Sequence, residues 1–87
     1  MKVTATQLRK LRACQEQVDL FVATFGESVE ITEALCLEHA GNFDWDWAAY
    51  NLLPAPAWAD YERAMASAEA DYERAMASAF GKLAESL

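Results

Sequence analysis

A ten-residue phrase occurs twice in this chain, and it constrains the fold more than any other feature. Residues 59–68 read ADYERAMASA, and after Glu69 the same ten letters recur at residues 70–79. The resulting period of eleven residues is close to three turns of α-helix, with about 20° of drift. Each side chain of the second copy therefore falls on nearly the same helix face as its counterpart in the first. The repeat predicts one helix with a continuous apolar face.

The predicted helix covers residues 57–86, a stretch that is rich in Ala and has no Pro. At 1.5 Å per residue it would be about 45 Å long. Its apolar face carries Tyr61, Met65, Tyr72 and Met76. Because a domain of this size has a radius of gyration of about 12 Å, part of that face would extend beyond the domain. The extended part could pair with a second copy as a homodimer; alternatively, the other helices cover it.

Apolar spacing and capping residues predict the rest of the fold. Residues 4–25 form one helix, or two shorter helices that divide near Arg12. A short extended piece, SVEIT, leads to Thr32, which caps a helix of two turns, and Asp44 caps a further helix that ends before Pro54. The prediction is an all-α fold: one small helical domain over residues 1–87 with about four helices and at most one minimal strand.

Composition supports a folded chain without a membrane span. Of the 87 residues, 54% are apolar, yet no run of eighteen apolar residues occurs. The first residues lack the apolar core of a secretory signal, so we expect a soluble cytoplasmic protein. Cys14 and Cys36 stand in no CxxC pair, which favours free thiols.

The charge pattern predicts the kind of partner. The net charge is −7, and the fifty residues between Arg12 and Arg63 contain ten carboxylates and no Lys or Arg. Such a chain repels nucleic acid and anionic membranes, and it attracts a basic protein surface. The alternative is that the carboxylates only keep a small protein soluble. The candidate partner-binding carboxylates are Glu27, Glu30, Glu33, Glu38, Asp44 and Asp46.

Aromatic residues gather beside these carboxylates. Residues 43–61 hold six of the ten aromatic side chains. Trp45 and Trp47 are two positions apart, about 200° around a helix, so they point in different directions. We expect one of them to pack inward and the other to be an exposed interface anchor, because Trp dominates binding hot spots. The alternative is that both are buried between helices.

The sequence offers no pattern typical of an enzyme. His39 is the one histidine, and it has no Cys or His at metal-ligand spacing. The glycines, Gly26, Gly41 and Gly81, are isolated and resemble helix-end residues rather than a phosphate-binding loop. No serine lies in a nucleophile elbow. We therefore expect a non-enzymatic protein with no metal and no cofactor.

Several motifs resemble those of small phage-encoded proteins. The segments QVDLFVATFG, DWDWAAYNLL and the two ADYER units are similar to a Q(V)xLFxxTFG front, a DWxWAAxxLL middle and tandem AEYER units in that group. The resemblance covers most of the chain and implies a phage or prophage origin, with action in the host cytoplasm. It transfers no activity and no site residue. By analogy, small acidic phage proteins include anti-CRISPR inhibitors that block host machinery.

Three functional hypotheses follow. The first is an anti-CRISPR-like inhibitor that covers the basic surface of a host nucleic-acid-binding complex, using the carboxylates together with Trp45 or Trp47. The second is an assembly module that self-associates through Tyr61, Met65, Tyr72 and Met76. The third is an antitoxin-like protein that covers a basic toxin, which the sequence does not separate from the first.

Overall fold

The computed structural model describes residues 1–68 and 71–87. The chain divides into two compact units, Met1–Ile31 and Thr32–Leu87, and each is considered by itself. Six helices and two strands lie in the described residues. The largely helical class is confirmed. The predicted number of about four helices is too low, and a two-stranded sheet occurs where at most one strand was predicted.

The first unit is a pair of helices between two short strands. Its elements are β1 (Lys2–Thr4), α1 (Ala5–Lys10), α2 (Gln15–Phe25) and β2 (Ser28–Glu30). The strands pair antiparallel, with Val3 opposite Val29. Residues 4–25 do not form one helix: the chain turns between α1 and α2, where Arg12 has a φ of 62°. Gly26 ends α2 with a φ of 80°, a conformation that favours glycine.

The second unit contains four helices. They are α3 (Glu33–Glu38), α4 (Trp45–Leu52), α5 (Ala55–Ala66) and α6 (Tyr72–Glu85). The predicted caps are confirmed, because the Thr32 hydroxyl accepts from Leu35 N at 3.2 Å and the Asp44 carboxylate accepts from Trp47 N at 3.0 Å. Pro56 lies in the first turn of α5, where its missing N–H leaves no helical bond unmade.

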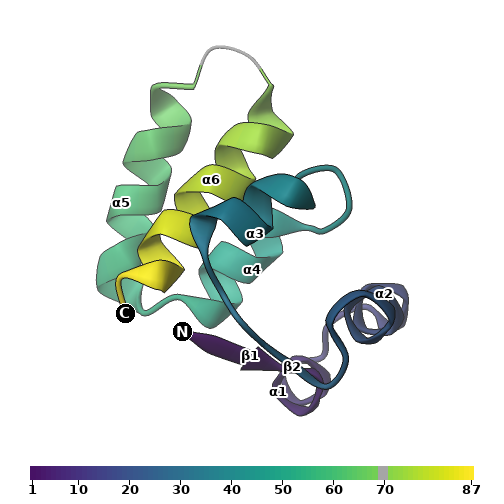
Figure 1. Ribbon diagram of the computed structural model, residues 1–87. Coiled ribbons are helices and arrows are strands. Elements are labelled where there is room, and N and C mark those ends of the chain that lie inside the picture. Colours follow the sequence, from purple (N-terminus) through teal and green to yellow (C-terminus); the bar gives the residue numbers. More distant parts are fainter. Residues whose placement is uncertain (69–70) are drawn as a thin grey trace. The chain divides into compact units, whose positions relative to one another are not determined.

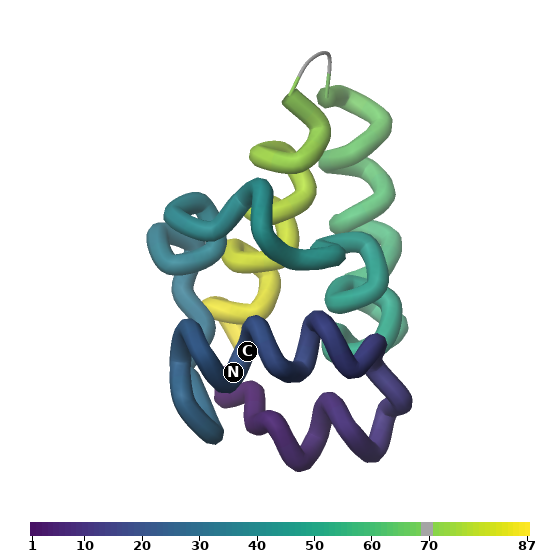
Figure 2. The backbone as a smooth tube through the Cα atoms, turned by 90° about the vertical axis from the view of Figure 1, so that its right-hand side faces the viewer, coloured from purple at the N-terminus to yellow at the C-terminus, as the bar shows by residue number. Residues whose placement is uncertain are grey.

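The single helix predicted over residues 57–86 is wrong. Helix α5 ends at Ala66 and α6 begins at Tyr72. The two helices run antiparallel and side by side (Figures 1 and 2). Folding back lets both copies of the repeat bury apolar side chains in one core, which a straight helix cannot do within a single small domain. Glu69, which separates the two copies of the repeat, lies outside the described residues.

Helix α6 is the centre of the second unit, since it packs against α3, α4 and α5 (Figure 1). Its inner face is made of Phe80 and small residues. Phe80 is 1% exposed, and its ring centroid lies 5.8 Å from that of Trp45 in α4. Small side chains on α6 allow the neighbouring helices to approach closely. The buried small residues are Ala77, Ala79, Gly81 and Ala84.

Gly81 marks the tightest of these approaches. A Cβ at this position would lie 2.7 Å from Glu33 Cα and 3.1 Å from the Cys36 side chain, both in α3. The expectation that Gly81 marks a helix end is therefore wrong, because it lies inside α6 and provides space for α3.

Replacing Gly81 with alanine should destabilise the protein, although Gly→Ala inside a helix usually stabilises. The added methyl has no space against α3, so we expect a loss of about 1–3 kcal/mol in the free energy of unfolding. Gly41→Ala is the matched control, because its Cβ would meet only the Glu73 carboxylate at 3.5 Å. Urea unfolding of both variants measures the difference; equal stability of the two would contradict the packing argument.

The two thiols should differ in reactivity. Cys14 is exposed, whereas Cys36 is buried beneath α6. Burial, with smaller contributions from Glu85 and Glu33, raises the pKa of Cys36 to about 12. Because the thiolate is the reactive form, a thiol reagent at about pH 8 should modify Cys14 quickly and Cys36 only after unfolding. Mass spectrometry of the labelled native protein tests this, and rapid modification of both residues would refute it.

Candidate functional site

The predicted partner-binding carboxylates are divided between the two units. Glu27 and Glu30 belong to the first unit, where both lie near positive charge. The Glu30 carboxylate is 2.9 Å from the N-terminal ammonium group, and the Glu27 carboxylate is 3.9 Å from the Arg9 guanidinium. Both side chains are largely exposed, so these pairs contribute little to stability.

The other four carboxylates lie in the second unit, and three have intramolecular roles. Glu33 accepts a hydrogen bond from Ser78 Oγ at 2.7 Å, which joins α3 to α6. Asp44 caps α4, and Asp46 accepts from the Tyr61 hydroxyl at 3.2 Å, which joins α4 to α5. Glu38 is exposed at the end of α3. The predicted set of partner-binding residues thus combined carboxylates that hold the fold together with a carboxylate that is available to a partner.

The net charge follows the division into units. The first unit holds four carboxylate residues and four Lys or Arg residues, so its side chains balance. The second unit holds ten carboxylate residues and three Lys or Arg residues, which leaves −7, the formal charge of the whole chain. The negative field of the chain therefore arises from the second unit.

The two tryptophans of α4 have different environments. Trp45 is 6% exposed, and its indole N–H donates to the Ala40 carbonyl at 2.9 Å. Trp47 is half-buried on another side of the helix. Of these two side chains, Trp47 is the one that can contribute to an interface.

A second aromatic pair is more exposed than Trp47. Tyr50 of α4 and Trp58 of α5 are each 36% exposed, and their ring centroids are 5.7 Å apart. The Tyr50 hydroxyl donates to Glu62 at 3.0 Å, and the Trp58 indole N–H donates to the Leu53 carbonyl at 3.0 Å. These bonds hold both rings in place. We name this set, Tyr50, Trp58 and Glu62 with Asp46, the aromatic–acidic surface.

The tyrosines of this region keep their protons. The hydrogen bond to Glu62 raises the pKa of Tyr50, and burial, followed by the charge of Asp46, raises the pKa of Tyr61. Each phenol therefore remains a hydrogen-bond donor to its carboxylate. The Tyr61 ring is fully buried, and its centroid lies 5.8 Å from that of Tyr50, so it supports the exposed pair from below.

The sequence indicated this surface only in part. Tyr50 and Trp58 belong to the aromatic-rich segment, but the eight-residue separation does not show that α4 and α5 bring their rings together. The signal that could have located the surface is Pro54, because a stop between two short helices makes them neighbours.

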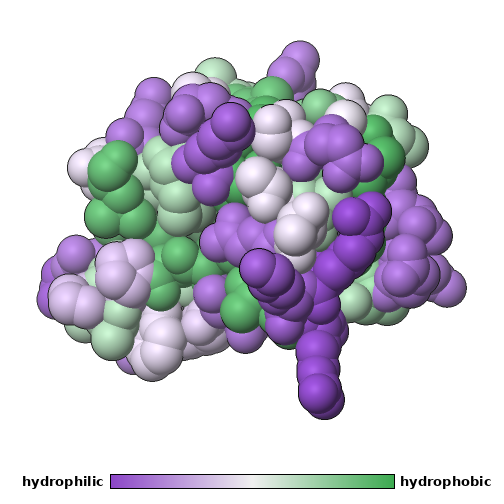
Figure 3. Space-filling model, turned by 90° about the horizontal axis from the view of Figure 1, so that it is seen from below, coloured by the Kyte–Doolittle hydropathy of each residue, from purple (hydrophilic) through white to green (hydrophobic). Residues whose placement is uncertain are grey.

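Exposed large apolar side chains occur elsewhere too, and in Figure 3 hydrophobic residues reach the surface among hydrophilic ones. The others are Leu11, Tyr72 and Leu87.

The predicted self-association face is divided between core and surface. Tyr61 is 0% exposed, Met65 and Met76 are half-buried, and Tyr72 is 57% exposed. The two copies also use their charges differently. Asp60 forms an ion pair with Arg63 at 2.7 Å, whereas Asp71 caps α6 by accepting from Arg74 N at 3.3 Å. Identical residues thus have different roles because the helix is interrupted between the copies.

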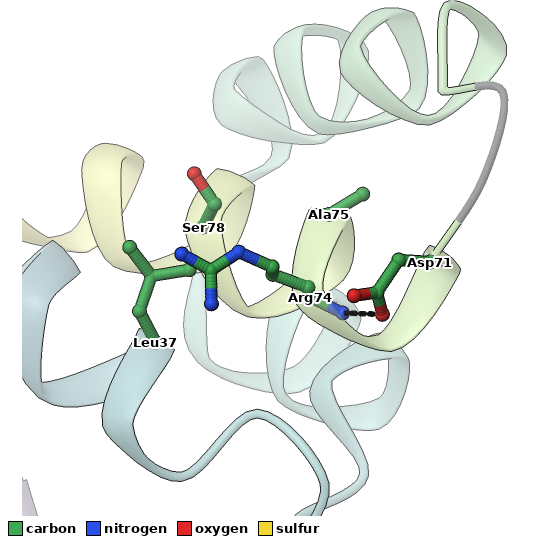
Figure 4. A pocket seen from close by; sticks show the side chains of 5 residues that line it. All are labelled: Leu37, Asp71, Arg74, Ala75 and Ser78. Carbon is green, nitrogen blue, oxygen red and sulfur yellow. Dashed lines mark hydrogen bonds between the residues drawn. The ribbon is translucent and has the colours of Figure 1, made fainter.

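A shallow hollow lies between α3 and α6. It has a volume of about 330 Å³, and its lining residues are Leu37, Asp71, Arg74, Ala75 and Ser78. The Arg74 side chain extends toward Leu37, while the Asp71 carboxylate turns back to the backbone (Figure 4). One cation and one carboxylate without a deep cavity do not define a ligand.

The described residues contain no cluster of three or more His, Cys, Asp or Glu side chains that could hold a metal ion. None of the helices within them is both long and apolar enough to cross a membrane. In comparisons with known proteins, no family model, no curated protein and no solved structure matches the chain.

Raising the pH should destabilise the protein through Tyr61. An unfolded tyrosine ionises near pH 10, whereas the folded phenol has a raised pKa, so its contribution to stability is complete below about pH 10 and is lost as the pH rises further. Tyr61→Phe should lose about 1 kcal/mol at neutral pH, because Asp46 loses its donor, and should show a shallower alkaline decline. Urea unfolding between about pH 8 and 11 measures both effects.

Tyr50→Phe is the matched control for this experiment. This substitution also removes a phenolic hydroxyl, but from a neighbouring tyrosine that is exposed. The pKa of Tyr50 is also raised, but its ring is far more exposed than that of Tyr61, so this variant should flatten the alkaline decline less than Tyr61→Phe does. If both variants flatten the decline equally, burial of Tyr61 is not its cause.

Proposed function

We propose that the chain is a non-enzymatic acidic binding protein that inhibits a host nucleic-acid-binding complex by covering its basic surface, as anti-CRISPR proteins do. The observation that supports this best is the aromatic–acidic surface, which lies on the unit that carries the whole net charge. The motif resemblance to phage-encoded proteins supports a host target and a cytoplasmic site of action.

The aromatic–acidic surface has the chemistry to bind Arg or Lys side chains. A guanidinium group stacks on the face of an exposed aromatic ring and pairs with a neighbouring carboxylate. Trp58 and Tyr50 offer the rings, and Glu62 offers a carboxylate oxygen beside them. Nucleic-acid-binding proteins present many such cations, which are arranged to contact phosphates.

The remaining carboxylates act at longer range. Glu38 is exposed on the same unit and adds to its negative field. Such a field increases the rate of association with a positive surface, while the aromatic anchors slow dissociation. The partner would then lose access to its nucleic acid, since both ligands need the same cations.

This proposal predicts that binding weakens as salt is added. Purified CRISPR effector complexes and other DNA-binding proteins of a bacterial host are suitable targets, with loss of DNA binding as the measurement. Between about 50 and 500 mM salt, affinity for a true target should fall by at least about tenfold, because mobile ions screen the attraction. Affinity that is constant over this range would exclude the mechanism.

The aromatic–acidic surface can be tested with one double variant. Trp58→Ala with Glu62→Lys should reduce inhibition by about a hundredfold, which corresponds to two lost anchor contacts of about 1.4 kcal/mol each. Glu16→Lys with Asp19→Lys is the control, because both residues are exposed on the first unit. Circular dichroism establishes that each variant is folded. Equal inhibition by the two variants would place the interface elsewhere.

A further inference from the structure

The connection between α5 and α6 lacks the residues that most often separate two helices. Residues 67–71 read SAEAD, with no Gly and no Pro. Three other junctions have such residues: Gly26 ends α2, Gly41 follows α3, and Pro54 precedes α5. The turn between α1 and α2, residues 11–14, also lacks them. Ala and Glu are good helix formers, and Ser and Asp are tolerated. The local sequence therefore favours continuation of the helix, although α5 and α6 run antiparallel.

The reversal also carries a conformational cost. Asp71 has φ 52° and ψ 62°, in the left-handed region. A residue with a Cβ is disfavoured there, although Asp and Asn tolerate it best. In a continuous helix Asp71 would have ordinary helical angles.

Packing of α6 explains why a single copy nevertheless folds back. Straightening the helix would withdraw α6 from α3, α4 and α5, and it would expose Phe80 and the Gly81 contact to water. This loss is avoided if the α6 of another copy occupies the vacated place. The same residues would then meet, so every contact of α6 would be kept.

We propose that a second copy of this chain exchanges α6 with the first, giving a domain-swapped dimer in which residues 55–85 form one helix in each copy. Short connections under strain are known to favour exchange of this kind. The proposal does not depend on the proposed function, and it needs no new contact surface.

The fraction of chains in the dimer should rise with protein concentration, as mass action requires. Light scattering after gel filtration measures the dimer, both in concentrated samples and after refolding at high protein concentration. Asp71→Ala should raise the dimer-to-monomer ratio at least about fivefold over the wild type, because alanine favours the helix and avoids the left-handed region. Asp71→Gly should lower the ratio, since glycine adopts positive φ freely. Both variants remove the same cap, so the difference between them isolates the backbone conformation.

The repeat provides a matched control. Asp60→Ala changes the equivalent aspartate of the first copy, which lies inside α5 on the exposed side. This variant should leave the dimer-to-monomer ratio at the wild-type value. A ratio that rises equally in Asp60→Ala and Asp71→Ala, or no dimer in Asp71→Ala after refolding, would overturn the proposal.

A distance measurement distinguishes exchange from simple surface association. Spin labels at Asp60→Cys and Lys82→Cys, in a Cys14→Ser and Cys36→Ala background, report the span of the helix. Residues 60 and 82 are 22 positions apart, which is about 33 Å in a continuous helix. In the hairpin they lie on neighbouring antiparallel helices, whose axes are about 10 Å apart. Dimers refolded with excess unlabelled chain should show the long distance, and dimers that keep the short distance of the monomer would refute exchange.

Discussion

The close approach of α3 to α6 at Gly81 determines how the second unit is built. Because a methyl group at Gly81 would collide with the backbone of Glu33, only glycine allows α3 to lie at this distance. Cys36 is then buried, and Ser78 can reach Glu33 with its hydroxyl. The opposite faces of α6 bury Phe80 against Trp45 of α4 and pack on α5. One central helix with small side chains thus positions the other three.

The candidate surface depends on this arrangement. Tyr61 is fully buried and donates to Asp46, which joins α5 to α4. This contact brings Tyr50 and Trp58 together on the outside of the same two helices. The carboxylates of the second unit divide into two kinds: Asp44 and Asp46 accept hydrogen bonds that hold the helices, whereas Glu38 accepts no such bond within the described residues. A charge pattern read along the chain does not separate these roles, since a cap and a free carboxylate have the same formal charge.

The repeated segment shows how tertiary packing can oppose a local preference. Eleven-residue periodicity, high Ala content and the lack of Gly or Pro all favour one long helix. Helical propensity contributes only tenths of a kcal/mol per residue, whereas burial of a large aromatic side chain contributes about 1.5–3 kcal/mol. The chain therefore folds back, and it accepts a left-handed Asp71. As a result Tyr61 is in the core while its counterpart Tyr72 is exposed.

The sequence by itself determined the features that depend on near neighbours. These include the helical class, the caps Thr32 and Asp44, the end of α2 at Gly26 and the excess of negative charge, because each depends on side chains within a few positions. Only the tertiary structure decided that the repeat is a hairpin, that Gly81 is a packing residue, and that Tyr50 meets Trp58. These features depend on contacts between helices that are distant in sequence, and their free energies exceed the local preferences that the sequence displays.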